Sequence, residues 1–192
     1  PLHDALRASA RPDVVLAVLQ AHPAATREAN DNGDLPLHMA LRGRAPADVV
    51  LAVLQAHPAA TSEANGNGDL PLHMALREDV PADVALAVQQ AHPAATREAN
   101  GDGDLPLHRA LRERAPADVA LAVLQANPTA TREANGNGDL PLHMALRGRA
   151  PADVVLAVLQ AHPAATREAN GDGDLPLHRA LRERAPADVA LA

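Results

Sequence analysis

The stretch Gly68-Asp69-Leu70-Pro71-Leu72-His73-Met74-Ala75 decides the fold, because its central Pro-Leu-His returns every 35 residues along the 192-residue chain. The tripeptide begins at Pro1, Pro36, Pro71, Pro106, Pro141 and Pro176. A fixed period in this range is the signature of a repeat architecture, in which each copy packs against its neighbours. The sequence therefore predicts a single repeat array of five copies and part of a sixth. The copies span residues 1–35, 36–70, 71–105, 106–140, 141–175 and 176–192.

Each copy contains two short helical segments, as the copy 36–70 illustrates. Residues 37–41 place Leu, Ala and Leu at i, i+3 and i+4, which predicts a short helix that opens with the preceding proline. After a break at 43–45, a second proline, Pro46, opens a helix that is apolar on nearly all sides. This helix ends at His57, because the proline after it disfavours the α conformation.

The rest of the copy predicts a finger loop. Residues 65–69 read Asn-Gly-Asn-Gly-Asp, which is strong turn chemistry, and residues 59–64 permit a brief helical turn after Pro58. The alternating oxygen side chains resemble the start of a calcium loop. The sixth residue is Leu and the twelfth is Arg, however, where such a loop needs Gly and a bidentate Glu. Turn formation explains the same residues, so we expect no metal and no cofactor here.

Composition excludes several classes of function. The formal net charge is −7, which disfavours a nucleic-acid binder, and no apolar run approaches the length that spans a bilayer. No cysteine is present, which is more typical of intracellular proteins than of disulfide-stapled secreted ones. The chain begins and stops inside copies, so a targeting segment or flanking domain would lie outside it.

Gly68 to Ala75 resembles the ankyrin signature Gly-x-Thr-Pro-Leu-His-x-Ala, in which a finger loop leads into a first helix. The order of a short helix, a turn, a Val-rich second helix and a finger also matches, and the resemblance covers the whole chain. It implies an all-α solenoid of stacked helix-turn-helix repeats with finger loops. Such stacking would bury the apolar faces that a lone helix pair leaves exposed.

The copies depart consistently from that family. They are 35 residues long instead of the usual 33, and the signature threonine is Leu in every copy, so we expect the preceding aspartate to cap the first helix. The leucine at position 51 and its equivalents replace a polar residue of the outer face. The length also fits pentatricopeptide repeats, which bind single-stranded RNA, but these lack the Pro-Leu-His entry and the acidic balance argues against RNA.

Two sets of histidines recur. The signature set suggests a metal column, but copies stack about 10 Å apart, too far for neighbours to share one ion. The resemblance implies instead that each imidazole is buried and bonds backbone at the start of the first helix. This set includes His38, His73, His108, His143 and His178. The second set ends the second helix at His22, His57, His92 and His162, and Asn127 replaces one member, which indicates capping or turn chemistry.

An arginine ends the first helix of every copy. These residues are Arg7, Arg42, Arg77, Arg112, Arg147 and Arg182. Stacking predicts that they form a basic ridge, opposite an acidic edge of finger aspartates. The aspartates are Asp34, Asp69, Asp104, Asp139 and Asp174. We expect the arginines to complement the helix dipole while solvated. The alternative is a ridge that grips carboxylates or phosphates on an extended ligand.

Positions that vary between copies, after the signature histidine and in the turn between the helices, are the candidate partner-binding surface. They include Met39, Arg44, Met74, Glu78, Asp79, Arg109, Glu113, Arg114, Met144, Arg149 and Arg179. No catalytic constellation is recognisable, and near-identical copies disfavour an active site, which needs different residues converging once. We therefore predict a non-enzymatic scaffold for protein–protein interaction. The alternative is a structural protein that self-associates through exposed repeat ends, a head-to-tail contact that need not close.

Overall fold

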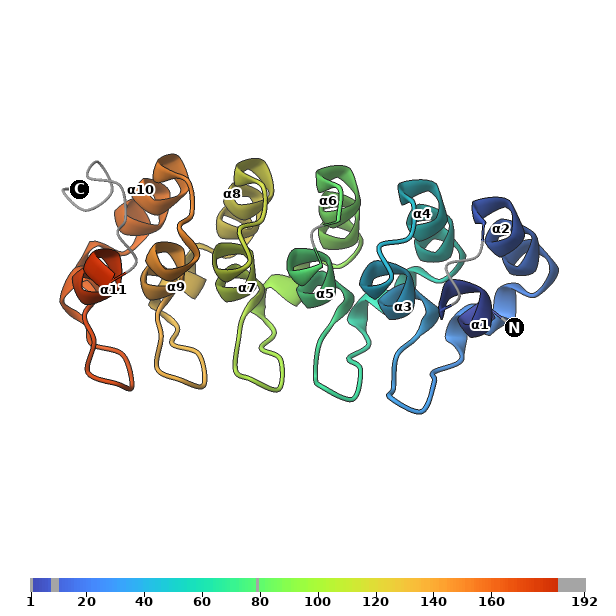
Figure 1. Ribbon diagram of the computed structural model, residues 1–192, viewed down its shortest axis with the longest axis horizontal. Coiled ribbons are helices and arrows are strands. Elements are labelled where there is room, and N and C mark those ends of the chain that lie inside the picture. The colour runs from blue at the N-terminus through green and yellow to red at the C-terminus, as the bar shows by residue number, and fades with distance from the viewer. Residues whose placement is uncertain (1, 8–10, 79, 183–192) are drawn as a thin grey trace. The chain divides into compact units, whose positions relative to one another are not determined.

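The computed structural model describes residues 2–7, 11–78 and 80–182, and every regular element within them is helical (Figure 1). The prediction of an all-α protein is therefore confirmed for the described residues. The chain divides into two compact units, unit 1 over residues 1–95 and unit 2 over residues 96–192.

Unit 1 holds the helices of the first three copies. Its elements are α1 (Leu2–Arg7), α2 (Pro12–Ala21), η1 (Pro23–Arg27), α3 (Pro36–Arg42), α4 (Ala47–Ala56), η2 (Pro58–Ser62), α5 (Pro71–Arg77) and α6 (Ala82–Ala91). The next element, η3 (Pro93–Arg97), contains the boundary between the units. Unit 2 continues with α7 (Pro106–Arg112), α8 (Ala117–Ala126), η4 (Pro128–Arg132), α9 (Pro141–Gly148), α10 (Ala152–Ala161), η5 (Pro163–Arg167) and α11 (Pro176–Arg182).

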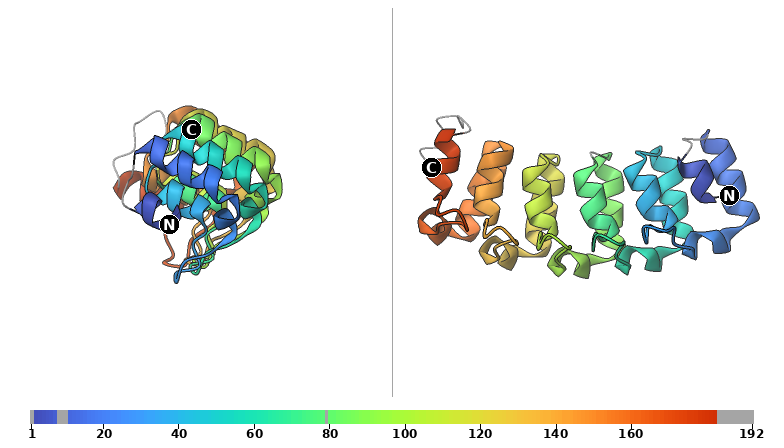
Figure 2. Two further views of the ribbon diagram at one scale, coloured as in Figure 1. Left: turned by 90° about the vertical axis from the view of Figure 1, so that its right-hand side faces the viewer. Right: turned by 60° about the horizontal axis from the view of Figure 1, so that its bottom comes forward.

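Within each unit, equivalent helices of neighbouring copies lie side by side (Figures 1 and 2). In unit 1 the first helices α1, α3 and α5 contact in order, and so do the second helices α2, α4 and α6. In unit 2 the same order holds for α7, α9 and α11, while α8 contacts α10. Each unit thus has a layer of first helices and a layer of second helices, and the fingers project from the layer of first helices (Figure 1).

Proline and histidine set the helix ends much as the sequence predicts. Pro36 is the first residue of α3, where its missing N–H costs no hydrogen bond. His57 leaves the α conformation at φ −145° and ψ 76°, and it ends α4. Pro46 is the residue before α4 instead of its first residue, since its ψ of 147° is extended. The brief helical turn after the second helix is real: η2 is a 3₁₀ helix.

Leucines and valines fill the seams between copies. Leu37 and Leu72 of unit 1 and Leu107 of unit 2 are at most 1 % exposed, and Val49 is equally buried. A short helix pair cannot shield such residues alone, so their burial depends on the neighbouring pair. The apolar seam also fixes where these fingers end, because Leu35, Leu70, Leu105 and Leu140 are buried immediately before the first helices.

Candidate functional site

The signature histidines join backbone groups of neighbouring copies. The backbone N–H of Leu35 donates to His38 Nδ1 at 3.2 Å, so Nε2 carries the proton and donates to the Asp69 carbonyl oxygen at 3.1 Å. His143 makes the same two bonds, to the Leu140 N–H and the Asp174 carbonyl. Leu70, Leu105 and Leu175 donate likewise to His73, His108 and His178. The expected backbone bonding is therefore confirmed, although His178 is exposed where the others are buried.

Burial keeps these imidazoles neutral. Desolvation lowers the pKa of His38, His108 and His143 below the usual value, against an opposing effect of Asp34, Asp104 and Asp139 nearby. A proton on Nδ1 would also abolish the bond from the leucine N–H. The folded chain therefore takes up these protons less readily than the unfolded chain does.

Acidification is expected to destabilise the fold. The unfolded chain binds protons at its histidines near pH 6.5 while the folded chain resists, so stability is full well above that pH and falls steadily as the pH drops through and below it. Urea denaturation followed by far-UV circular dichroism at several pH values measures the slope. NMR titration of the imidazole protons assigns it to His38, His108 and His143. A free energy of unfolding that is constant or rises on acidification would refute this account.

The second set of histidines also links copies. His57 Nδ1 lies 3.2 Å from the carbonyl oxygen of Thr26 in the preceding η1, and His162 Nδ1 lies 3.1 Å from that of Thr131. Asn127, which replaces the histidine in one copy, donates from Nδ2 to the Thr96 carbonyl at 2.9 Å. The substitution preserves a hydrogen bond to the preceding 3₁₀ helix, which explains why either residue serves. These positions are structural.

Every finger described after 30–34 is closed by a buried asparagine that the sequence pattern marks only as a turn residue. Asn65 Oδ1 accepts the N–H groups of Asn67 and Asp69, both at 3.0 Å. Its Nδ2 donates to Asp34 Oδ1 of the preceding finger at 2.9 Å. Asn135 and Asn170 repeat all three bonds in unit 2. The sequence does contain a signal for this network: in every finger an asparagine stands four residues before the aspartate that precedes the first helix.

Neighbouring fingers also contact through bare backbone. The Gly66 N–H donates to the Asn32 carbonyl at 2.9 Å, and a Cβ on Gly66 would lie 2.6 Å from that oxygen. Gly136 stands against Asp102 in the same way. The finger 30–34 has a side chain at this position, Asp31, and Asp31 is exposed. Glycine is therefore required where another finger precedes.

The arginines that end the first helices bind the finger aspartates. Arg42 donates to both carboxylate oxygens of Asp34, at 2.6 and 3.0 Å, while Asp34 is fully buried. The Asp69–Arg77 and Asp104–Arg112 pairs repeat the contact at 3.1 and 2.9 Å. The prediction of a basic ridge opposite an acidic edge is therefore wrong, because the two charges meet. The predicted aspartate cap is also replaced, because the side chain that bonds the residue before α3 is His38. Each arginine compensates a carboxylate that is costly to bury.

Burial corrects part of the candidate partner-binding surface. Met74 and Met144 are fully buried and Met39 is 9 % exposed, so these side chains pack in the core and cannot face a partner. Arg109 is 6 % exposed and binds two aspartates of its own finger, Asp102 at 2.9 Å and Asp104 at 3.1 Å. Arg179 occupies the equivalent place in α11.

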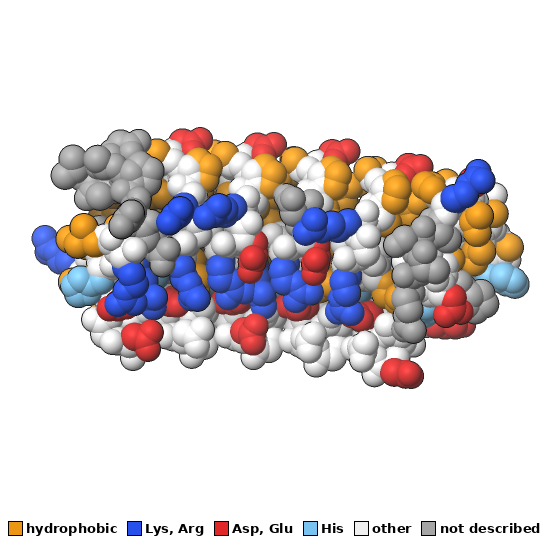
Figure 3. Space-filling view, in the orientation of Figure 1, with side chains coloured by type: hydrophobic (Ala, Val, Ile, Leu, Met, Phe, Trp, Pro, Cys, Tyr) orange, Lys and Arg blue, Asp and Glu red, His pale blue; other side chains and the backbone are white. Residues whose placement is uncertain are grey.

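The turn residues stay at the surface. Arg44, Arg114 and Arg149 are exposed and adopt positive φ angles of 49°, 60° and 55°. Arg114 Nε donates to the Gly148 carbonyl of the next copy at 2.6 Å. Glu78 and Glu113 accept from the adjacent Arg77 and Arg112. Asp79 lies outside the described residues. Within each unit, arginine side chains lie beside the fingers, with acidic side chains among them (Figure 3).

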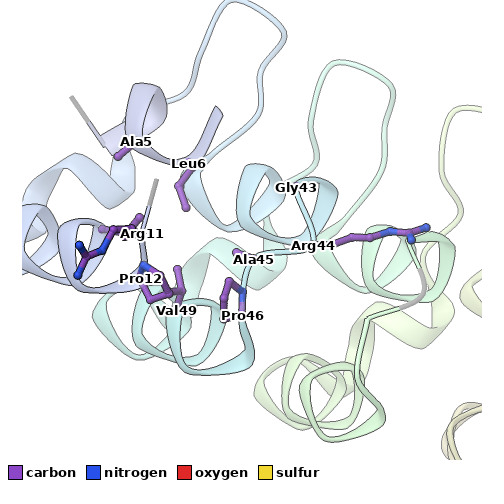
Figure 4. A pocket seen from close by; sticks show the side chains of 10 residues that line it. Ala5, Leu6, Arg11, Pro12, Gly43, Arg44, Ala45, Pro46 and Val49 are labelled. Atoms are coloured by element: carbon purple, nitrogen blue, oxygen red, sulfur yellow. The ribbon is translucent and has the colours of Figure 1, made fainter. Parts of the chain in front are cut away.

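Unit 1 contains an apolar cavity of 320 Å³ between the turns of its first two copies (Figure 4). Leu6, Val15 and Val49 line it, while Arg44 points away from it (Figure 4). Arg11, at its rim, is paired with Asp13 at 2.8 Å. The cavity therefore presents apolar side chains and little that would orient a ligand.

Within the described ranges, no three His, Cys, Asp or Glu side chains are placed to hold a metal ion. None of the helices described in the structure is long and apolar enough to cross a bilayer.

No protein-family model and no curated protein matches this chain. The chain is similar to one in the solved complex of the Bd0816 predatory endopeptidase from Bdellovibrio bacteriovorus with the immunity protein Bd3460. The TM-score is 0.77 at 22 % sequence identity, over 99 % of this chain and 94 % of that chain. At this identity the likeness shows the fold alone. In all, 403 solved chains are similar, so the fold does not single out one function.

Proposed function

We propose that this chain is a non-enzymatic scaffold of ankyrin-like repeats that binds a protein partner. The carrying observation is that exposed arginines recur at a fixed position of the turns, in a fold whose neighbouring fingers are joined by hydrogen bonds. Arg114 and Arg149, for example, occupy the same turn position of neighbouring copies in unit 2. A rigid, regularly spaced surface loses little conformational entropy on binding, which suits recognition of an extended partner.

Two further observations support the ankyrin-like interpretation and the kind of partner. Each complete copy has a finger, a Pro-Leu-His helix entry, a turn and a second helix in the order of that family, with a 3₁₀ helix added before the finger. The similar solved structure is a complex of two proteins, an endopeptidase and an immunity protein, which offers a precedent for protein binding by this fold.

A selection of displayed random peptides on the folded chain tests this function. We expect enriched peptides whose binding falls at least tenfold when Arg44, Arg114 and Arg149 are all changed to alanine, because each exposed arginine supplies charge-assisted hydrogen bonds. The matched control changes three exposed arginines of the 3₁₀ helices, Arg27, Arg132 and Arg167, to alanine. Failure to enrich any peptide, or equal loss in both triple variants, would count against a scaffold that uses the turns.

Exposed seam residues favour a second candidate, self-association. Leu177 of α11 is 50 % exposed, whereas the equivalent Leu142 is 3 % exposed. Val14 of α2 is 46 % exposed, whereas the equivalent Val49 is 1 % exposed. Both residues therefore present surfaces that other copies bury against a neighbour, and a second molecule could cover them.

Sedimentation velocity across protein concentrations measures self-association. The expected result is growth of the sedimentation coefficient with concentration, which Val14→Asp abolishes and Leu156→Asp leaves intact. Leu156 is an exposed apolar residue of an internal copy, so its replacement shows whether losing any exposed apolar side chain is enough to change self-association. A monomer at every concentration would remove this candidate and leave the scaffold untouched.

A further inference from the structure

Unit 2 contains a polar cleft of 480 Å³ between two fingers and the helices α9 and α11. Two guanidinium groups and an exposed amide line it. The lining residues are Gly136, Asn137, Gly138, Asp139, Arg147, Gly171, Asp172 and Arg179. This cleft lies where a finger with Asn137 meets a finger with Asp172, and where the following first helix carries Arg179 instead of methionine.

Arg147 makes the longest aspartate contact of its kind in the described part of the chain. Its equivalents Arg42, Arg77 and Arg112 lie 2.6, 3.1 and 2.9 Å from their aspartates. Arg147 lies 4.0 Å from Asp139, and its side chain is 48 % exposed. Its N–H groups therefore remain available to a ligand.

Arg179 faces the same carboxylate as Arg147. Its Nη2 approaches Asp139 to 3.9 Å, so two guanidinium groups share one buried carboxylate and neither reaches it closely. In unit 1 the residue equivalent to Arg179 is Met74, and there Arg42 holds Asp34 at 2.6 Å.

Arg179 is itself loosely held. It lies 3.4 Å from Asp172 and 3.5 Å from Asp174, whereas Arg109 reaches its own aspartates at 2.9 and 3.1 Å. Arg179 Nε is buried without a hydrogen bond. The cleft thus holds two cations whose contacts with carboxylates are long, and one of them, Arg179, is nearly buried.

The acidic groups of the cleft restrict its ligand. Asp139 is buried and accepts from Asn170 Nδ2 at 2.6 Å, while Asp172 is 79 % exposed. The formal charge of the lining is zero, since Arg147 and Arg179 balance Asp139 and Asp172. Asp172 disfavours a ligand that places several negative charges inside the cleft, but a single carboxylate of a peptide could bind both guanidinium groups while peptide N–H groups face Asp172.

We propose that this cleft binds a carboxylate side chain of an acidic peptide segment, with Arg147 and Arg179 as its donors. The site rests on the proposed scaffold function and names one contact within it. Because the cleft requires an arginine in the following copy, the Asp34 junction of unit 1, where that residue is Met74, lacks it.

The test uses the full chain and a short synthetic peptide of alternating glutamate and alanine. We expect the Nε–H NMR signals of Arg147 and Arg179 to shift on titration, and Arg147→Gln to weaken binding about tenfold, the effect of losing one strong charge-assisted contact. Arg132→Gln is the matched control, since it removes one exposed charge outside the cleft. Arg147 is half exposed and makes only a distant contact with Asp139, so the variant should melt as the parent does.

Several outcomes would overturn the proposal. Unchanged affinity in Arg147→Gln excludes the cleft, and equal weakening in both variants indicates unspecific attraction. Tighter binding of a phosphoserine peptide or of an RNA oligonucleotide than of the glutamate peptide assigns a different ligand. If the displayed-peptide selection succeeds while the glutamate peptide fails, the scaffold stands and this site falls.

Discussion

Replacing Asn135 with alanine is expected to lower the free energy of unfolding by about 3 kcal/mol, because the change leaves several buried polar groups without partners. Asn135 Oδ1 accepts the N–H groups of Asn137 and Asp139, and its Nδ2 donates to Asp104 Oδ1 at 2.8 Å. Alanine therefore opens its own finger and removes a donor from a buried carboxylate of the finger before it. Urea denaturation followed by far-UV circular dichroism measures the loss.

Two variants sharpen this test. Asn137→Ala removes an exposed asparagine side chain two residues along the same finger and should change stability by at most about 0.5 kcal/mol. Asn135→Asp preserves size but sets a second carboxylate against Asp104, so it should be at least as damaging as alanine at neutral pH. If Asn135→Ala were as mild as Asn137→Ala, the network between fingers would contribute nothing to stability.

Replacing Gly136 with alanine is expected to cost about 2 kcal/mol, the usual penalty of forcing a methyl group into a filled site. The new Cβ would lie 2.5 Å from the Asp102 carbonyl oxygen, so the fingers must separate and the Gly136 N–H loses its acceptor. Both groups belong to rigid backbone, which cannot yield as a side-chain tip can. The same denaturation experiment reports the effect.

Asp31→Ala is the control for Gly136→Ala. Asp31 occupies the equivalent position of the finger 30–34, where it is exposed and already carries a Cβ. We expect its replacement to leave stability within about 0.5 kcal/mol of the parent. Equal effects at Gly136 and Asp31 would mean that finger contact does not require a bare backbone.

The helices could be predicted from sequence because the residues that place them act locally. A proline such as Pro36 is tolerated at the first position of a helix but not in its interior. His57 precedes a proline, which disfavours the α conformation and so ends the helix there. The signature histidines were also foreseeable, although that inference came from a family resemblance. Their bonds to Leu35 and its equivalents bear it out.

The polar network could not be predicted from the period alone. A repeat of 35 residues aligns equivalent residues of successive copies, but it does not say which unlike residues meet. Asp34 and Arg42 are eight positions apart along the chain, and Asn65 reaches Asp34 from the next finger. The burial of Met74 was missed for a related reason, since the first helix is covered on more sides than its apolar pattern indicates.

The difference between Asp31 and the finger glycines limits how such a gene can lengthen. Unequal crossing-over that duplicates the finger containing Gly66 or Gly136 inserts a segment that fits between two other fingers. Its glycine has no side chain at the point where a carbonyl oxygen of the preceding finger makes contact. Duplicating the finger with Asp31 into the interior would press a side chain against that carbonyl. Recombination can therefore expand the array from copies whose finger carries glycine at this position, whereas the finger with Asp31 is a poor template until a mutation turns its aspartate into glycine.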